Sequence, residues 1–247
     1  MQYYRLILYS FFGIIPSLIW LFYYLRKDTH PESKGMVMRV FLFGALITVP
    51  VFFVQIGLTL LMEKFQIPPF IYDFLYWFVI IAFTEEVFKY LVLRYCVINN
   101  SEFDEALDTM LYMIIAALGF AALENTLYLF TPAENMKFSE VLNRTLIISF
   151  VRFIGATFLH TLCSGLFGYF LAISFKETKN RIKIALIGLF SASLLHGLYD
   201  FSIMTFEPPF QLSVPAMVLV GLAIFMIWAF NRIKKVKNIC KIELSET

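Results

Sequence analysis

The sequence predicts an all-α integral membrane protein, a polytopic bundle of about seven transmembrane helices with a polar cavity inside the membrane. Three observations lead to this class. The chain of 247 residues is 60% hydrophobic and 15% charged, whereas soluble domains are about half apolar and about a quarter charged. Its apolar residues form seven long runs, and a small set of ionisable residues interrupts them. This composition excludes a soluble globular domain, a disordered chain and a nucleic-acid-binding protein.

Each of the seven runs reaches the length of about 20 mainly apolar residues that a membrane-spanning helix needs. The runs are too long and too continuous for the alternating blocks of about ten residues that are typical of membrane β-barrels. In chain order, the predicted spans are residues 6–25, 40–61, 70–97, 109–131, 145–175, 182–205 and 213–231.

The first run, Leu6 to Leu25, lacks the cleavage site of a secretory signal and is followed by Arg26 and Lys27. It is therefore predicted to remain in the protein as a membrane helix. The third and fifth runs are expected to tilt, kink or project, because 28 residues at 1.5 Å each reach about 42 Å against a hydrocarbon core of about 30 Å. The third run follows a double proline and begins with an aromatic-rich stretch, so residues 62–82 could span the membrane, re-enter it or lie at its interface.

Lysine and arginine residues indicate the orientation, because they concentrate in cytoplasmic connections. They cluster after the first span, after the fifth span and in a short C-terminal tail, residues 232–247. An odd number of spans places these three segments on one side. We therefore predict an N-terminus outside and a C-terminus in the cytoplasm. One transmembrane domain is expected to fill residues 1–247, with a motif-bearing core at about 70–205.

Eight ionisable residues lie inside the predicted spans and away from the span ends. A charged residue at the centre of a membrane helix costs about 2.5–3.5 kcal/mol, while a leucine returns only about 0.3–0.6 kcal/mol. Such residues usually face a bundle interior or an aqueous cavity and mark a functional site. The eight residues are Glu85, Glu86, Lys89, Glu124, Arg152, His160, His196 and Asp200.

The spacing of these residues predicts a single cluster. Lys89 follows Glu85 by four positions and Glu86 by three, so it shares a helix face with either carboxylate. His196 and Asp200 are also four positions apart, which lets the carboxylate orient the imidazole. Four residues on four different spans lie at similar depths, about 14–24 Å from the cytoplasmic ends at 1.5 Å per residue. These four are Glu85, Glu124, His160 and His196.

Carboxylates with two imidazoles can hydrolyse an amide in two ways. In one, His160, His196 and a carboxylate such as Glu124 hold zinc while another glutamate is the general base. In the other, a glutamate activates water without a metal, and histidine with neighbouring donors stabilises the oxyanion. A serine mechanism stays open because Ser164 shares a helix face with His160, although the chain has no G-x-S-x-G and no H-E-x-x-H motif.

Structural roles are the alternative for several of these residues. His160 could serve as a hydrogen-bonding group between helices, and Glu85 with Lys89 could form a structural ion pair. Arg152 could extend toward the membrane surface or pair with a carboxylate. Asn125, beside Glu124, could hydrogen-bond between helices. The presence of all eight ionisable residues at matched depth favours a functional cluster over these separate explanations.

Four motifs resemble those of one known family, the PrsW-type intramembrane proteases. Glu85-Glu86-Val87-Phe88-Lys89 resembles their EE-x-x-K motif, and Phe120 to Asn125 resembles their F-x-x-x-E-N motif. Arg152 followed by His160 is similar to their R…H helix, and His196 to Asp200 resembles H-x-x-x-D. Asp28 with Pro31-Glu32 is similar to a D…P-E stretch near their N-terminus. The resemblance covers about residues 26–202.

The resemblance implies hydrolysis of a peptide bond in a membrane-anchored protein within a bacterial inner membrane. Studied members make the first cut, a site-1-type cleavage, in membrane-anchored anti-sigma factors. The family is metalloprotease-like, so Zn²⁺ is implied as a cofactor. The related CAAX prenyl endopeptidases have other residues where this chain has Lys89, Glu124 and Asp200. These departures favour the PrsW type.

We therefore expect an intramembrane endopeptidase whose partners are a membrane-anchored protein or peptide substrate and the lipid bilayer, with no nucleic acid. Glu85 or Glu86 activates water, and Lys89 pairs with the other carboxylate. Asp200 orients His196. The expected metal ligands, or holders of the water and the oxyanion, are Glu124, His160 and His196, and the expected supporting residues are Asn125 and Arg152. A CAAX-type endopeptidase, a proton- or cation-coupled transporter and a non-catalytic scaffold are the alternatives, although the chain shows no internal repeat.

Overall fold

The structure is a computed structural model that describes residues 3–27, 32–130, 136–177 and 179–235. Every regular element within these ranges is helical, so the predicted all-α class is confirmed. The elements are α1 (Tyr3–Leu25), α2 (Lys34–Met62), α3 (Pro69–Phe74), the π-helix η1 (Leu75–Phe83), α4 (Thr84–Cys96), α5 (Ala106–Leu129), α6 (Phe138–Ile154), α7 (Ala156–Ser174), α8 (Arg181–Thr205) and α9 (Phe210–Ile233).

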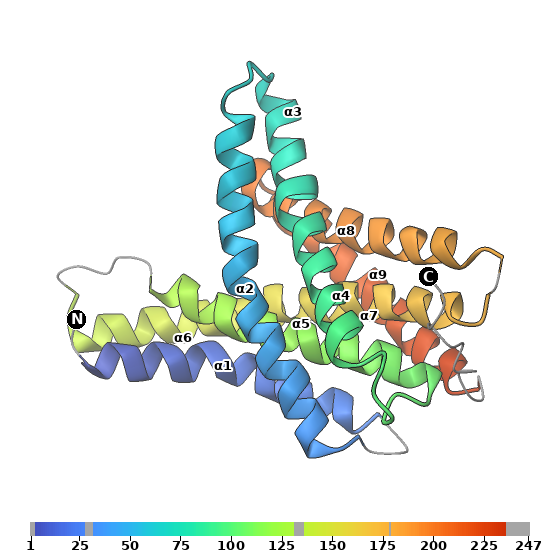
Figure 1. Cartoon of the computed structure of the whole chain (residues 1–247). Helices are drawn as coiled ribbons and strands as arrows, with labels where there is room; N and C mark the ends of the chain where they lie inside the picture. Colours follow the sequence, from blue (N-terminus) through green and yellow to red (C-terminus); the bar gives the residue numbers. More distant parts are fainter. Residues whose placement is uncertain (1–2, 28–31, 131–135, 178, 236–247) are drawn as a thin grey trace.

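Six helical stretches of the described chain are long and apolar enough to cross a membrane: α1, α2, α5, α6 with α7, α8, and α9. The prediction was about seven. The difference lies in the third run, residues 70–97, which is occupied by α3, η1 and α4 in direct succession. The π-helical middle divides this run, and α4 contains four charged residues, so no long apolar helix is found there. Figure 1 shows this run alongside α2, with the pair crossing the other helices.

Helix α5 is the centre of the fold. Its most apolar 18-residue window is 94% buried, whereas the corresponding windows of the other five candidate spans are 28–39% buried. A helix that is apolar on all sides is expected to be enclosed by other helices. In Figure 1, α5 runs through the middle of the molecule, and it packs against α1, α2 and α7. It therefore helps to position α4 and α7, two of the helices that carry the polar cluster.

Glycines permit these close contacts with α5. Gly13 of α1, Gly44 of α2 and Gly168 of α7 all face α5 so closely that an added Cβ would overlap its atoms. Gly119 of α5 faces the backbone of α2 in the same way. Small residues at such positions let helix backbones approach and replace the hydrophobic driving force that is absent between helices in lipid.

The fifth predicted span, residues 145–175, bends at Gly155, where α6 ends and α7 begins. The predicted kink is therefore observed. The bend frees the backbone carbonyl of Phe153, which accepts a hydrogen bond from Nε1 of Trp20 at 3.1 Å. A Cβ at Gly155 would overlap the hydroxyl of Tyr199, so the missing side chain lets α8 approach the bend.

Contacts between helix ends mark two different ends of the bundle. At one end, Ser33 donates to Glu102 at 2.6 Å, and the rings of Phe103 and Phe175 are in contact. At the other end, Tyr4 at the start of α1 meets Phe138 at the start of α6. The predicted cytoplasmic side corresponds to the first of these ends. Several residues used in the predictions lie outside the described residues: Asp28, Pro31 and the tail from residue 236 onward.

Candidate active site

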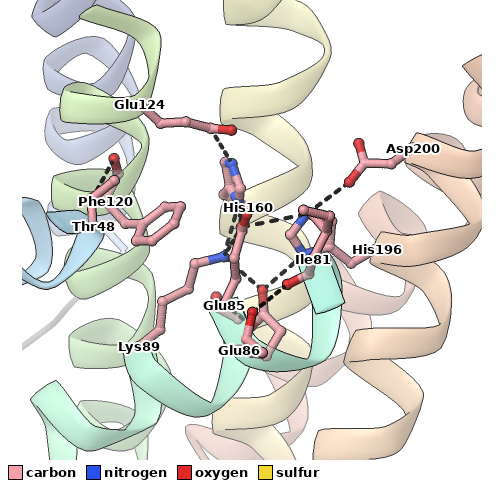
Figure 2. Close-up of polar contacts among 12 residues, drawn as sticks. Thr48, Ile81, Glu85, Glu86, Lys89, Phe120, Glu124, His160, His196 and Asp200 are labelled. Carbon is pink, nitrogen blue, oxygen red and sulfur yellow. Dashed lines mark hydrogen bonds and ion pairs between the residues drawn. The ribbon is translucent and has the colours of Figure 1, made fainter. Parts of the chain in front are cut away.

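The seven residues predicted to be catalytic form one connected cluster at the junction of α4, α5, α7 and α8 (Figure 2). Each helix contributes at least one of them. Helix α4 provides Glu85, Glu86 and Lys89, α5 provides Glu124, α7 provides His160, and α8 provides His196 and Asp200. Segments far apart in the sequence thus place their rare ionisable residues against one another.

Lys89 is at the centre of the cluster, and its side chain is 0% exposed. Its ammonium Nζ lies 2.8 Å from Oε1 of Glu86 and 3.4 Å from Oε2 of Glu85. It also lies 4.7 Å from the centre of the Phe120 ring. A buried charge is tolerated only when it is paired and hydrogen-bonded. The shorter distance makes Glu86 the principal partner of Lys89.

The second α4 carboxylate, Glu86, is enclosed by donors. Besides Lys89, it accepts a hydrogen bond from Oγ of Ser164 at 2.8 Å and lies 3.1 Å from Nδ1 of His196. Ser164 was considered as a nucleophile because it shares a helix face with His160. Its hydroxyl instead donates to Glu86, which supports a positioning role.

His196 lies between carboxylates. Its Nδ1 faces Glu86, while its Nε2 lies 3.4 Å from Oδ2 of Asp200 and 3.7 Å from Oε2 of Glu85. The contact with Asp200 has the geometry expected for a carboxylate that orients an imidazole four residues earlier. Figure 2 shows Asp200 pointing from α8 toward this ring.

His160 faces a different set of groups. Its Nε2 lies 2.9 Å from Oε2 of Glu124, and its Nδ1 lies 2.9 Å from Nζ of Lys89. Its ring is perpendicular to that of His196, with the ring centres 5.0 Å apart. Nδ1 of His160 also lies 3.9 Å from Oε2 of Glu85. The two imidazoles therefore flank the same carboxylate oxygen.

Arg152 and Asn125, which were predicted as supporting residues, hold Glu124. Nη2 of Arg152 lies 2.6 Å from Oε2 of Glu124, and Nε donates to Oδ1 of Asn125 at 2.5 Å. The guanidinium lies over the ring of Tyr128, 3.9 Å from its centre. Asn125 donates in turn to Thr157 at 2.9 Å. Of the alternatives for Arg152, the structure favours pairing with a carboxylate.

The structure brings together a group that could hold a metal ion and that differs by one residue from the predicted ligands. Glu85, His160 and His196 are the group of the described residues that could hold a metal ion, with one ligand atom of each within 4.8 Å of the others. Glu124 was predicted in place of Glu85. The Glu124 carboxylate contacts Nε2 of His160, which is the ring nitrogen away from Glu85, and it also pairs with Arg152. Glu124 therefore lies on the opposite side of the imidazole from Glu85.

The donor atoms of this group suit zinc. Tetrahedral zinc binds nitrogen and oxygen at about 2.0–2.2 Å, so its ligand atoms lie roughly 3.3–3.5 Å apart. Oε2 of Glu85 lies 3.9 Å from Nδ1 of His160 and 3.7 Å from Nε2 of His196, which is within a small adjustment of that spacing. The remaining nitrogen of each imidazole faces a carboxylate, Glu124 or Glu86, an arrangement typical of the surroundings of zinc-binding histidines.

Sequence reasoning missed Gln55 of α2. Its Nε2 donates to Oε1 of Glu85 at 3.3 Å and so adds a fifth helix to the site. The prediction started from spans that contain ionisable residues, and the span of Gln55 contains no Asp, Glu, Lys, Arg or His. An amide in the middle of an otherwise apolar run was the signal that could have identified it.

The cluster is accessible from one side. The side chains of Asp200 and Glu124 are 24% and 21% exposed, whereas those of Glu86 and Lys89 are 0% exposed. Asp200 and Glu124 each lie five residues before the end of their helix, about 8 Å along the axis at 1.5 Å per residue. These helix ends belong to the side that is opposite the predicted cytoplasmic connections.

Comparison with known proteins identifies the family. Residues 32–229 match the family model described as PrsW family intramembrane metalloprotease. The chain belongs to the PrsW family. It is 30% identical to Protease PrsW of Oceanobacillus iheyensis over 84% of this chain and 88% of the relative. It is also 30% identical to Protease PrsW of Bacillus subtilis, over 92% of this chain and 94% of the relative.

A third relative, Protease PrsW of Clostridioides difficile, is 29% identical over 89% of this chain and 86% of its own length. No solved structure matches the chain. The family and the relatives agree that this PrsW-family member is an intramembrane protease and a multi-pass membrane protein. The predicted family and enzyme class are confirmed.

Proposed function

We propose that this PrsW-family protease cleaves a membrane-anchored protein near the outer face of a bacterial inner membrane, using water activated at Glu85. The observation that carries the proposal is the position of Oε2 of Glu85. It lies within 4 Å of a nitrogen of both His160 and His196. Among the described residues, Glu85 is the carboxylate that lies with two imidazoles in a group able to hold a metal ion.

Glu85 is a better proton acceptor than Glu86. Lys89 is closer to Glu86, at 2.8 Å against 3.4 Å, and Glu86 also accepts from Ser164. Its lone pairs are therefore occupied by donors. Gln55 holds Oε1 of Glu85, whereas Oε2 faces the two imidazoles and has only a long contact of 3.4 Å with Lys89. A water molecule beside this oxygen is oriented by the rings and can transfer its proton to the carboxylate as it attacks a peptide carbonyl.

The metal part of the proposal uses the same three side chains. Glu85, His160 and His196 would hold Zn²⁺, which would make a bound water more acidic and polarise the scissile carbonyl. Glu124 and Glu86 orient the two imidazoles from behind, and Asp200 faces Nε2 of His196 from the accessible side. With zinc bound, the protein residues would thus supply the ligands and their orientation, and Glu85 would be a ligand rather than the proton acceptor.

The proposed substrate is a single-span, anti-sigma-factor-like regulator, and the cut is a site-1-type cleavage. The resemblance of the motifs to the PrsW type supports this substrate class. The exposure of Glu124 and Asp200 toward the predicted outer end supports cleavage near the outer surface. No observation favours a transporter or a prenyl-protein endopeptidase over the protease.

The test uses purified protein in lipid with a membrane-tethered single-span peptide. We expect Glu85→Gln to lower the rate of cleavage by about 10²–10⁴-fold, the usual contribution of a general base. The matched control is Glu63→Gln, because Glu63 is exposed at the end of α2. Chelation should abolish cleavage, and added Zn²⁺ should restore it. Wild-type rates for Glu85→Gln would reject the assignment of the base, and unchanged activity after complete removal of metal would reject the zinc ligands.

A further inference from the structure

We propose that a groove formed by α7, α8 and α9 is a binding site for an anionic phospholipid. An acyl chain of the lipid lies in the groove, and the phosphate lies beside Arg232, at the end of the molecule that carries the basic connections. This site is separate from the polar cluster, and the inference does not depend on the proposed function.

The groove is an apolar hollow of about 500 Å³ where these three helices pack against one another (Figure 1). Pockets for small ligands usually measure about 300–1,000 Å³. Among the described residues that line it, Ser191 is the only polar one. Because α7, α8 and α9 all belong to stretches that are apolar and long enough to cross a membrane, the groove opens into hydrocarbon. An apolar chain is therefore the occupant that it suits.

The groove and the polar cluster use different faces of α8. Ser191, Leu195 and Leu198 line the groove and follow one another at steps of four and three positions, so they share one face. His196 and Asp200 share another face, and at 3.6 residues per turn the two faces point roughly 150° apart. A molecule in the groove therefore lies behind α8 and leaves the polar cluster free for a peptide.

Gly221 of α9 provides room in the groove. It lines the groove, and nothing lies within 4 Å of a Cβ added to it. The glycines that face α5 differ from it, because a Cβ added there would overlap another helix. Met217, one turn before Gly221, also lines the groove and is 63% exposed. The space beside Gly221 is therefore available to a molecule outside the chain.

The face of α9 that lines the groove continues to a tryptophan and an arginine. Its groove residues follow one another at steps of four and three positions: Val214, Val218, Gly221 and Phe225. The same steps lead on to Trp228 and Arg232. The Trp228 ring contacts the rings of Phe225 and Tyr169, and the Arg232 guanidinium lies 5.1 Å from its centre. Tryptophan is enriched at membrane–water interfaces, so the groove leads toward the membrane surface and ends at a cation.

The charge at this end of the groove is complementary to a lipid phosphate. Arg232 is exposed, and Lys234 and Lys235 follow it at the end of α9. Basic sites beside membrane helices on the cytoplasmic side bind the headgroups of anionic lipids. Arg232 lies seven residues beyond Phe225, about 10 Å along the axis at 1.5 Å per residue. An acyl chain that leaves the groove along α9 therefore brings its phosphate to the guanidinium.

A membrane helix suits the groove less well than an acyl chain does. Helix α9 lines the groove from Val214 to Phe225, a length of about 17 Å at 1.5 Å per residue. A helix with its side chains is about 10–12 Å across, so this length of helix takes up at least about 1,300 Å³. The groove offers about 500 Å³. An apolar helix would also supply no anion to Arg232.

The experiment is native mass spectrometry of the full chain in detergent micelles, titrated with phosphatidylglycerol, which is anionic, or phosphatidylcholine, which is zwitterionic. We expect the first phosphatidylglycerol to bind at least about fivefold more tightly, the usual contribution of one basic residue near an anionic lipid. Arg232→Gln should remove this preference, and Arg232→Lys should retain most of it. The matched control is Arg39→Gln, an exposed arginine of α2, which should have no effect.

The groove itself is tested by Gly221→Leu, whose side chain would fill the open space. This variant should lose the tightly bound phosphatidylglycerol. Gly57→Leu is the matched control, because nothing lies within 4 Å of a Cβ added at Gly57 of α2, which is outside the groove. If Gly221→Leu does not fold, Met217→Trp fills the same groove and makes the same test.

Equal affinities of the wild-type protein for the two lipids would overturn the proposal, and so would tight binding of phosphatidylglycerol by folded Gly221→Leu. A dimer that Gly221→Leu abolishes while the lipid is retained would also overturn it, because the groove would then be a contact between two copies of the chain. Glu85→Gln should bind phosphatidylglycerol as the wild-type protein does. If the wild-type protein cleaves no peptide, the proposed function fails and the lipid measurement is unaffected.

Discussion

At the scale of single residues, Lys89 determines how the two α4 carboxylates differ. Its fully buried ammonium is shared by Glu86, Glu85 and His160. The closer pairing neutralises Glu86 and leaves Glu85 facing the imidazoles. Two adjacent glutamates therefore have different surroundings, because one lysine on the next turn is nearer to one of them.

Lys89→Met should destabilise the protein by about 3–5 kcal/mol, the usual loss when one partner of a buried ion pair is removed. Glu86 and Glu85 would then face each other in a buried site without a cation. The free energy of unfolding of purified protein in detergent is the measurement, with Lys34→Met at an exposed position as the control. The double variant Glu86→Gln with Lys89→Met should lose less than the sum of the single variants. A loss of under about 1 kcal/mol for Lys89→Met would show that the pair behaves like a surface ion pair.

At the scale of elements, glycines allow neighbouring helices to pack closely against α5. The contact between α2 and α5 matters most for the site, because α2 carries Gln55 and α5 carries Glu124. Gly44 and Gly119 face the backbone of the opposite helix. Thr48 reinforces the contact, since its hydroxyl lies 3.4 Å from the carbonyl oxygen of Phe120. A wider separation would move Gln55 away from Glu85.

Gly119→Ala should therefore lower the free energy of unfolding by about 1–3 kcal/mol, the usual cost of overpacking, and should reduce cleavage. The added methyl group would meet backbone atoms at Phe41 and Ala45, which cannot move aside as a flexible side chain can. Gly221→Ala is the matched control, because nothing lies within 4 Å of its added Cβ. It should be neutral or stabilising by up to about 1 kcal/mol through helix propensity. Equal effects of the two substitutions on unfolding would argue against the close α2–α5 contact.

At the scale of the whole molecule, the helices arrange their connections into two groups with different charge. The end that contains Ser33, Glu102 and Phe175 coincides with the lysine- and arginine-rich connections. The more exposed carboxylates of the site, Glu124 and Asp200, lie toward the opposite end. The position of the site relative to the membrane faces is therefore linked to the orientation of the chain.

Fused after residue 247, a fluorescent protein should be active and alkaline phosphatase inactive, because the basic segments are expected on the cytoplasmic side. Inserted in the connection at residues 63–68, alkaline phosphatase should be active and the fluorescent protein inactive, because this connection is expected outside. Paired fluorescent-protein and alkaline-phosphatase fusions measure both positions in cells. The reverse pattern at both positions would place the accessible side of the cluster at the cytoplasmic face and contradict cleavage near the outer surface.

Much of the fold was predictable because apolar runs are local. The runs correspond closely to the observed helices, and the excess length of the fifth one indicated the bend at Gly155. The division of the third run by a π-helix was not predictable, because the same apolar residues suit an α-helix equally well. Gln55 was missed for a related reason: an uncharged amide costs too little in an apolar run to stand out.

The sequence by itself determined that the chain is a multi-span membrane protein and which side chains form its polar cluster. Both follow from the cost of placing charge in lipid, which depends on residue type and run length and not on the fold. Only the tertiary structure decided the partners. It paired Lys89 more closely with Glu86 than with Glu85, and it placed Glu85 rather than Glu124 in the group that could hold a metal ion. Spacing along one helix leaves such choices open, because they depend on which faces of different helices meet.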